Sequence, residues 1–244
     1  MKTTKPIGIR YLLMKRNLVT IGIIISGILS IIMVLLTYYG SYSGNFIAVV
    51  DSNERVSSIV LSTSRDFEDA SPRLFADSIS DSKPLIFSDT NVQEAVLSEG
   101  NYFDPDFKYF AYSFYITNNG NITRDVEARY ILSETNRGAD EAIRVIVIRN
   151  DDIDNLSTDN LRMYKKKDKV PGRYNPNDPE AITFHDEDNG IVFSEIIEDF
   201  NPGEIKKYTV IIYIEGNDPD SIDEIQGGLI KMTFRFKIVE PEEN

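Results

Sequence analysis

Acidic loops are the only stretches of this sequence whose residue types and spacing could do chemistry. Acidic side chains gather at residues 151–154, 186–188 and 218–224. Hard cations such as Ca²⁺ take six to eight oxygen ligands, and exported proteins often bind them in loops of this kind. None of the three loops has EF-hand spacing, so solvated turns are the simpler interpretation. The residues that would bind Ca²⁺ are Asp186, Asp188, Asp218, Asp220 and Asp223.

Catalytic groups are scarce in this chain. His185 is the only histidine and there is no cysteine, which excludes most histidine-based triads, cysteine nucleophiles and thiolate metal sites. Acids are plentiful, so a pair of carboxylates that cleaves a glycosidic bond stays open, but no pair stands in a recognisable motif. We therefore expect a protein that is not an enzyme and needs no cofactor, with a carboxylate-based hydrolase as the least favoured alternative.

The elements that position these loops begin with an apolar segment at residues 18–39. It contains no charged residue and no proline. At about 1.5 Å of rise per residue it is long enough to cross about 30 Å of hydrocarbon, where a helix satisfies its own backbone. Gly22, Ser26 and Ser30 recur every fourth residue, the pattern that lets two membrane helices pack closely. A lone helix facing lipid is the simpler interpretation of that spacing.

The flanks of this segment set its orientation. Five basic residues and no acid precede it, so the positive-inside rule predicts a cytoplasmic tail at residues 1–17 and exports residues 45–244. Residues 40–44 (GSYSG) form the expected hinge. The Ser41-Tyr42-Ser43 sequence resembles the exit of a cleaved signal peptide, but the apolar core is longer than the usual 7 to 15 residues. We therefore expect an uncleaved signal anchor in a bacterial cell membrane, with the C-terminal domain extracellular.

Charge and composition restrict the partners. The chain has 26 basic and 39 acidic residues, and five of the basic ones precede residue 18, so the exported part carries 21 − 39 = −18. Such acidity repels phosphate backbones, so we expect no nucleic-acid partner. The expected partners are the lipid bilayer through residues 18–39, other surface proteins, and further copies of the chain. An exported domain without cysteine must be stabilised by its own core, as on a bacterial surface.

Alternating apolar residues predict the fold of the exported part. The final segment is the clearest case, because Met232, Phe234 and Phe236 alternate with Thr233 and Arg235. A turn at residues 118–121 connects two further alternating segments into a hairpin. We expect short helical turns at 90–97 and 221–227, and a long surface loop at 62–84. The strands are expected at 45–50, 56–61, 109–116, 125–132, 142–148, 181–185, 191–200, 208–214 and 229–239.

Seven to nine strands with turn signals and no long helices indicate a mainly β domain. The predicted fold is one N-terminal transmembrane helix followed by a single antiparallel β-sandwich at 45–244, of jelly-roll or immunoglobulin-like type. If the chain polymerises, a strand at 45–50 is the one we expect to be donated to a neighbour.

Several segments resemble a known group of proteins. Residues 44–50, 61–67, 109–119, 136–144 and 213–228 together are similar to a group of uncharacterised single-pass surface proteins of Gram-positive Firmicutes. The most specific piece is EGNDPD with the following IQGG. More distantly, the order of elements is similar to that of the TasA/camelysin group of exported β-sandwich proteins, whose best-known members form biofilm matrix fibres. Members of the group that it resembles often carry a cysteine after the Asn-Asp-Pro, whereas here Asp220 is followed by Ser221.

The resemblance implies a surface role and assigns no catalytic residue. The expected function is therefore that of a membrane-anchored, non-catalytic structural or adhesion module. The alternatives are a secreted biofilm-matrix fibre subunit after cleavage near Ser43, and a binding subunit of a membrane complex.

Overall fold

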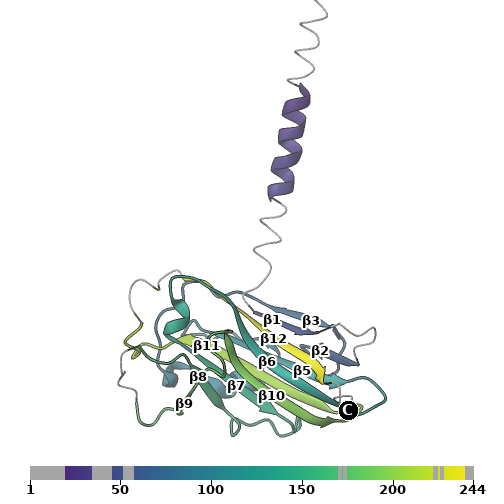
Figure 1. Cartoon of the computed structure of the whole chain (residues 1–244), viewed down its shortest axis with the longest axis vertical. Helices are drawn as coiled ribbons and strands as arrows, with labels where there is room; N and C mark the ends of the chain where they lie inside the picture. Colours follow the sequence, from purple (N-terminus) through teal and green to yellow (C-terminus); the bar gives the residue numbers. More distant parts are fainter. Residues whose placement is uncertain are drawn as a thin grey trace, which may run out of the picture. The chain divides into compact units, whose positions relative to one another are not determined.

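The computed structural model describes residues 20–34, 46–51, 58–169, 172, 175–221, 225 and 228–239. The chain divides into two compact units, Met1–Ser43 and Gly44–Asn244 (Figure 1). In the first unit residues 20–34 are helical and exposed. Among the described residues, no helix reaches the length and apolarity that a membrane crossing requires. The predicted span at 18–39 extends beyond this helix at both ends, and the predicted tail at 1–17 and hinge at 40–44 lie outside the described residues.

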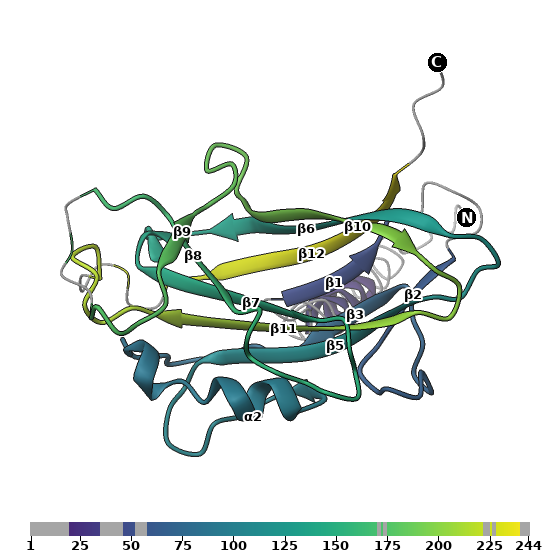
Figure 2. The ribbon, with the colours of Figure 1, turned by 90° about the horizontal axis from the view of Figure 1, so that it is seen from below.

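The second unit is built from two β-sheets, seen edge-on in Figure 2. Sheet A has the strand order β10-β6-β12-β1-β3 and sheet B the order β2-β5-β11-β7-β8-β9, with β4 paired to β5. Sheet A consists of β1 (Phe46–Val50), β3 (Arg73–Ala76), β6 (Arg124–Thr135), β10 (Ile191–Phe200) and β12 (Ile230–Val239). Sheet B consists of β2 (Ile59–Ser62), β4 (Gly100–Asn101), β5 (Phe110–Asn118), β7 (Ile143–Asn150), β8 (Arg162–Lys165), β9 (Ala181–Thr183) and β11 (Ile205–Ile214). The predicted mainly β fold is confirmed, and two packed sheets are consistent with a sandwich.

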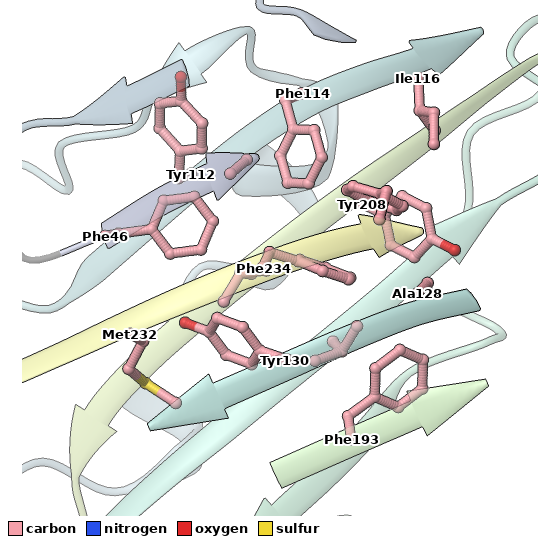
Figure 3. Packing of buried hydrophobic residues seen from close by; sticks show 14 of the residues in the cluster. Phe46, Tyr112, Phe114, Ile116, Ala128, Tyr130, Phe193, Tyr208, Met232 and Phe234 are labelled. Atoms are coloured by element: carbon pink, nitrogen blue, oxygen red, sulfur yellow. The ribbon is translucent and has the colours of Figure 1, made fainter. Parts of the chain in front are cut away.

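An aromatic core fills the space between the sheets (Figure 3). Alternation along β5, β11 and β12 directs Phe114, Tyr208 and Phe234 inward, and all three are fully buried. The ring of Phe234 meets those of Phe114 and Tyr208 edge-to-face, with centroids 5.6 and 4.9 Å apart. Such pairs add about 0.5–1.5 kcal/mol each beyond the area they bury. This core explains how a domain without disulfides is held together.

Strand β1 corrects the expectation of a purely antiparallel sandwich. It pairs with β12 in parallel and with β3 in antiparallel, so it lies inside sheet A. Its inward residues Phe46, Ala48 and Val50 are buried. Strands β8 and β9 are also parallel to each other. Alternation predicts which face a residue occupies but carries no information on strand direction, which is why the sequence missed both pairings.

The outer face of sheet B is covered by a short helix, α2 (Val92–Leu97). Asn91, not the predicted Thr90, caps it, and its side chain accepts a hydrogen bond from the Glu94 backbone at 3.4 Å. Val92, Ala95 and Val96 pack in a second apolar cluster against β5, β7 and β11. Two 3-10 turns, η1 (Phe87–Asp89) and η2 (Ala139–Glu141), complete the described helical elements. The predicted loop at 62–84 contains β3, and most of the predicted turn at 221–227 lies outside the described residues.

Candidate functional site

A polar seam runs where β10 of sheet A faces β7 and β8 of sheet B. A hollow of about 130 Å³ lies here, and a second of about 310 Å³ adjoins it and shares Arg162 and Phe193. We call the two hollows together the seam. The first is lined by Val147, Arg149, Asp151, Asn160, Arg162, Phe193 and Glu195. The second adds Tyr164, Ile182, Thr183, His185 and Ser194.

Glu195 lines the first hollow of the seam because its position on β10 directs the side chain inward. Phe193 and Ile197 are buried in the core, and Glu195 lies two residues from each along the strand. Because side chains alternate between the faces of a strand, Glu195 points to the same face of the sheet as these two residues. One carboxylate oxygen accepts hydrogen bonds from the Arg149 guanidinium at 2.7 Å and the Tyr208 hydroxyl at 2.9 Å. A carboxylate buried this deeply costs several kcal/mol unless cations compensate it. The Arg149 guanidinium is such a cation, so Glu195 acts as one member of an ion pair.

A second cation and a second acid extend this network. Arg162 approaches the other Glu195 oxygen at 3.3 Å, with about half of its side chain exposed. Asp151 accepts from Arg149 Nε at 3.0 Å and from Lys206 Nζ at 2.9 Å. Partial burial works to raise the pKa of Asp151, but the hydrogen bond from Lys206 and the charge of Arg149 outweigh it and lower that pKa. The seam therefore holds alternating fixed charges.

This arrangement suits binding better than acid–base chemistry. A general acid at neutral pH needs a raised pKa, whereas the pKa of Asp151 is lowered and Glu195 is shared between two arginines. Ligand sites usually enclose about 300–1,000 Å³. The first hollow is well below that range, and the second only reaches it. Arg162, at the junction of the hollows, is the seam cation with the greatest exposure to a ligand.

The histidine and one of the acidic loops predicted from the sequence lie beside the seam. His185 lines the second hollow, and its backbone N–H donates to Val192 O at 3.2 Å. Asp186 turns to Asn189, whose side-chain amide donates to it at 2.8 Å, and this hydrogen bond lowers the pKa of Asp186. Asp188 is exposed. The 186–188 loop is thus organised as a hydrogen-bonded turn.

The second predicted calcium loop is used for an internal ion pair. Asp218 is buried and lies 2.9 Å from the Arg144 guanidinium. Asp220 accepts a hydrogen bond from the Lys169 backbone at 3.3 Å, and Asp223 lies outside the described residues. Across the described ranges no three acidic or histidine side chains gather as a metal site would require. Calcium binding that involves Asp223 stays a prediction.

The ion pair joins two segments that are far apart in the sequence, 136–144 and 213–228. Arg144 belongs to 136–144 and Asp218 to 213–228. Directly after the second segment, Leu229 N donates to the side chain of Asn136, the first residue of 136–144, at 2.7 Å. A Cβ added to Gly228 would lie 2.6 Å from the Ala139 Cβ, so this close approach requires glycine. Arg144, Asp218 and Gly228 are therefore accounted for by packing.

The proposed helix-packing residues lie in the described helix at 20–34. Gly22, Ser26 and Ser30 are exposed, and the Ser30 hydroxyl donates to the Ser26 backbone carbonyl at 2.9 Å. This is a bond within the helix, so it neither supports nor opposes a partner helix.

One buried cation lies apart from the seam, on the outer side of sheet B. Lys207 is fully buried and donates to Ser98 O at the C-terminal end of α2, at 2.7 Å. Its ammonium lies 5.0 Å from the centre of the Tyr115 ring. Burial lowers the pKa of Lys207 to about 8. A cation at this position complements the free carbonyls of a helix end, so its role is structural.

Sequence reasoning missed the charged residues that form the seam. Arg149, Arg162 and Glu195 look like ordinary polar positions within or beside predicted strands. Glu195 alone carries a local signal, because it occupies an inward position between Phe193 and Ile197. An acid at such a position requires a cation from another strand, but only the fold identifies which one.

Comparisons with known proteins identify no relative. The sequence matches no protein-family model and no curated protein, and the structure matches no solved structure.

Proposed function

We propose that this chain is a single-pass surface protein of Gram-positive bacteria, whose extracytoplasmic β-sandwich acts as a non-catalytic structural or adhesion module. The apolar segment at 18–39, flanked by basic residues, would anchor it with the C-terminal domain outside. The compact unit Gly44–Asn244 contains its own two apolar clusters, as a module presented on a tether needs. The TasA/camelysin resemblance belongs to this proposal as a likeness of element order.

The observation that carries the non-catalytic role is the charge pairing in the seam. Its acids, Asp151 and Glu195, both contact Arg149, and each has a second cation, Lys206 or Arg162. Glycoside hydrolysis needs one carboxyl group that stays protonated near neutral pH. Asp151, whose pKa is lowered, does not meet that requirement, and Glu195 is held between two arginines. Fixed, matched charges suit a polar interaction site.

The alternative is a matrix subunit released by cleavage near Ser43. It is favoured by β1, which begins at Phe46, shortly beyond Ser43, and fills a position between β12 and β3. A strand exchanged between copies would be this one. In a single copy, however, β1 already places Phe46, Ala48 and Val50 in the core, so donation requires it to leave its own sheet.

The experiment that separates these functions is the N-terminus of the mature protein, measured together with its location. We expect an intact N-terminus in the membrane fraction, and a C-terminal domain accessible to protease added outside cells. A Ser43→Phe variant, which removes the small-residue exit, should leave both results unchanged. A wild-type chain found in the medium and beginning at Gly44, with cleavage abolished in Ser43→Phe, would replace the anchored module by the released subunit.

A further inference from the structure

The two sheets differ in what covers their outer faces. α2 and its apolar cluster lie on the outer face of sheet B, below β5 and β11 in Figure 2. Within the second unit, Figure 2 shows no helix on the outer side of sheet A, where β6, β12 and β10 lie. The outward residues Ile47, Val49 and Thr233 are only half-buried, and Arg235 and Lys237 are exposed. Among the described residues of this unit, sheet A therefore presents a bare face.

The strand register builds a row of arginines across that face. Arg129 on β6 lies directly opposite Arg235 on β12, and Arg235 pairs with Val49 on β1. Val49 in turn pairs with Arg73 on β3. Neighbouring strands lie about 4.8 Å apart, so the three arginines follow one line perpendicular to the strands. We call Arg73, Arg129 and Arg235 the arginine row.

This row is not explained by the stability of the sheet. Like charges directly opposite each other in a sheet are destabilising, whereas an opposite-charge pair stabilises it. Glu127 on the same strand compensates Arg129. Among the described residues, Arg73 and Arg235 take part in no ion pair. In a domain with almost twice as many acids as bases, two uncompensated arginines on one bare face point to a role outside the fold.

An apolar row lies beside the arginines. Ile131, Thr233, Ile47 and Phe75 are paired in sequence across β6, β12, β1 and β3. Phe75 has half of its surface exposed. Arginine and aromatic side chains are enriched where protein interfaces gain most of their energy, and guanidinium groups bind carboxylates in a two-pronged geometry. The combination matches a protein partner better than a bare polyanion, which would not use Phe75.

We infer that the bare face of sheet A docks an acidic protein segment, whose carboxylates pair with the arginine row and whose apolar side chains cover Ile47 and Phe75. The inference rests on the proposed function, because it names the docking surface of the module. Two copies of this chain do not fit face to face, since that would oppose arginines to arginines, and their exported parts each carry −18. The complement is therefore an acidic surface of another protein.

The test uses a short peptide in which Glu and Val alternate. Its binding to the full chain, held in lipid nanodiscs, is measured. The double variant Arg73→Glu/Arg235→Glu should weaken binding at least tenfold. The matched control is Lys83→Glu/Lys108→Glu, which changes the net charge equally at exposed sites outside sheet A and should alter binding less than twofold. Phe75→Ser should weaken binding severalfold without any change of charge.

Folding of the variants is checked by their thermal unfolding. Arg235→Glu places an acid opposite Arg129, so its stability should equal or exceed that of the wild type. The comparison of peptide affinity is repeated with neutral variants, which remove the positive charges without reversing them. These are Arg73→Gln/Arg235→Gln and, as the matched control, Lys83→Gln/Lys108→Gln.

Three results would overturn the inference. The first is that the wild type does not bind the peptide. The second is that both double variants lose peptide affinity equally. The third is that the wild type binds inorganic polyphosphate through the arginine row, while Phe75→Ser has no effect on that binding. Self-association of the wild type that only the row variant abolishes would also replace the acidic partner by a second copy. All four leave the anchoring experiment untouched, so failure here is distinct from failure of the proposed function.

Discussion

The buried ion pair between Arg144 and Asp218 makes the sharpest prediction about this molecule. Asp218→Asn keeps the shape of the side chain and removes its charge, leaving the Arg144 guanidinium buried without its partner at 2.9 Å. Breaking a buried pair in this way costs about 3–5 kcal/mol. In a domain of this size each kcal/mol lowers the melting temperature by about 2–4 °C, so we expect a fall of about 6–20 °C.

The assay is thermal and urea unfolding of the full chain in detergent, with Ca²⁺ and with a chelator. Asp188→Asn is the control, because Asp188 is an exposed acid from the other predicted calcium loop and should change stability by less than about 0.5 kcal/mol. The double variant Arg144→Met/Asp218→Leu should recover most of the loss, since two apolar residues leave no buried charge.

A different pattern would refute this reasoning. If the wild type lost stability when the chelator removed Ca²⁺, and Asp218→Asn lost none beyond that, Asp218 would be a metal ligand. The internal ion pair would then be the wrong account of the 218–220 loop.

Three further predictions concern other parts of the fold. Glu195→Gln should destabilise the domain by about 2–4 kcal/mol in urea unfolding, because it leaves Arg149 short of its closest carboxylate; a loss under about 1 kcal/mol would show that water replaces this pair. Because the folded pKa of Lys207 lies near 8, below its unfolded value, the unfolded state binds more protons between pH 8 and 10. The stability of the wild type relative to Lys207→Met should therefore rise by about 1–2 kcal/mol across that window. The difference is the quantity to measure, because buried tyrosines with raised pKa values lower the stability of both proteins as the pH approaches 10. Gly228→Ala should cost about 1–3 kcal/mol by calorimetry, since its Cβ would lie 2.6 Å from Ala139, and Gly203→Ala, where space is open, tests the effect of backbone angle alone.

The sequence determined the elements and their inner faces. The alternation through Met232, Phe234 and Phe236 needs only neighbours two residues apart, so it can be read locally, and those residues are buried as expected. The predicted hairpin is wrong, because β5 belongs to sheet B and β6 to sheet A, and the two strands do not pair with each other. The local turn signal at 118–121 is compatible with a connection between the sheets, so it does not determine which strands pair. The absence of cysteine likewise excludes disulfides and thiolate metal sites, because it follows from composition alone.

Tertiary structure decided which elements meet. The parallel pairing of β1 with β12 joins residues almost 190 positions apart, and no local pattern encodes it. Asp218 illustrates the consequence for function, because its position in an acidic loop predicts a cation ligand until the fold brings Arg144 against it. The seam and the arginine row arise in the same way, from side chains of strands that are distant in the chain. Charge at one position is local information, but its compensation depends on long-range pairing, and that pairing alone determines whether a charged residue supports the fold or remains available to a partner.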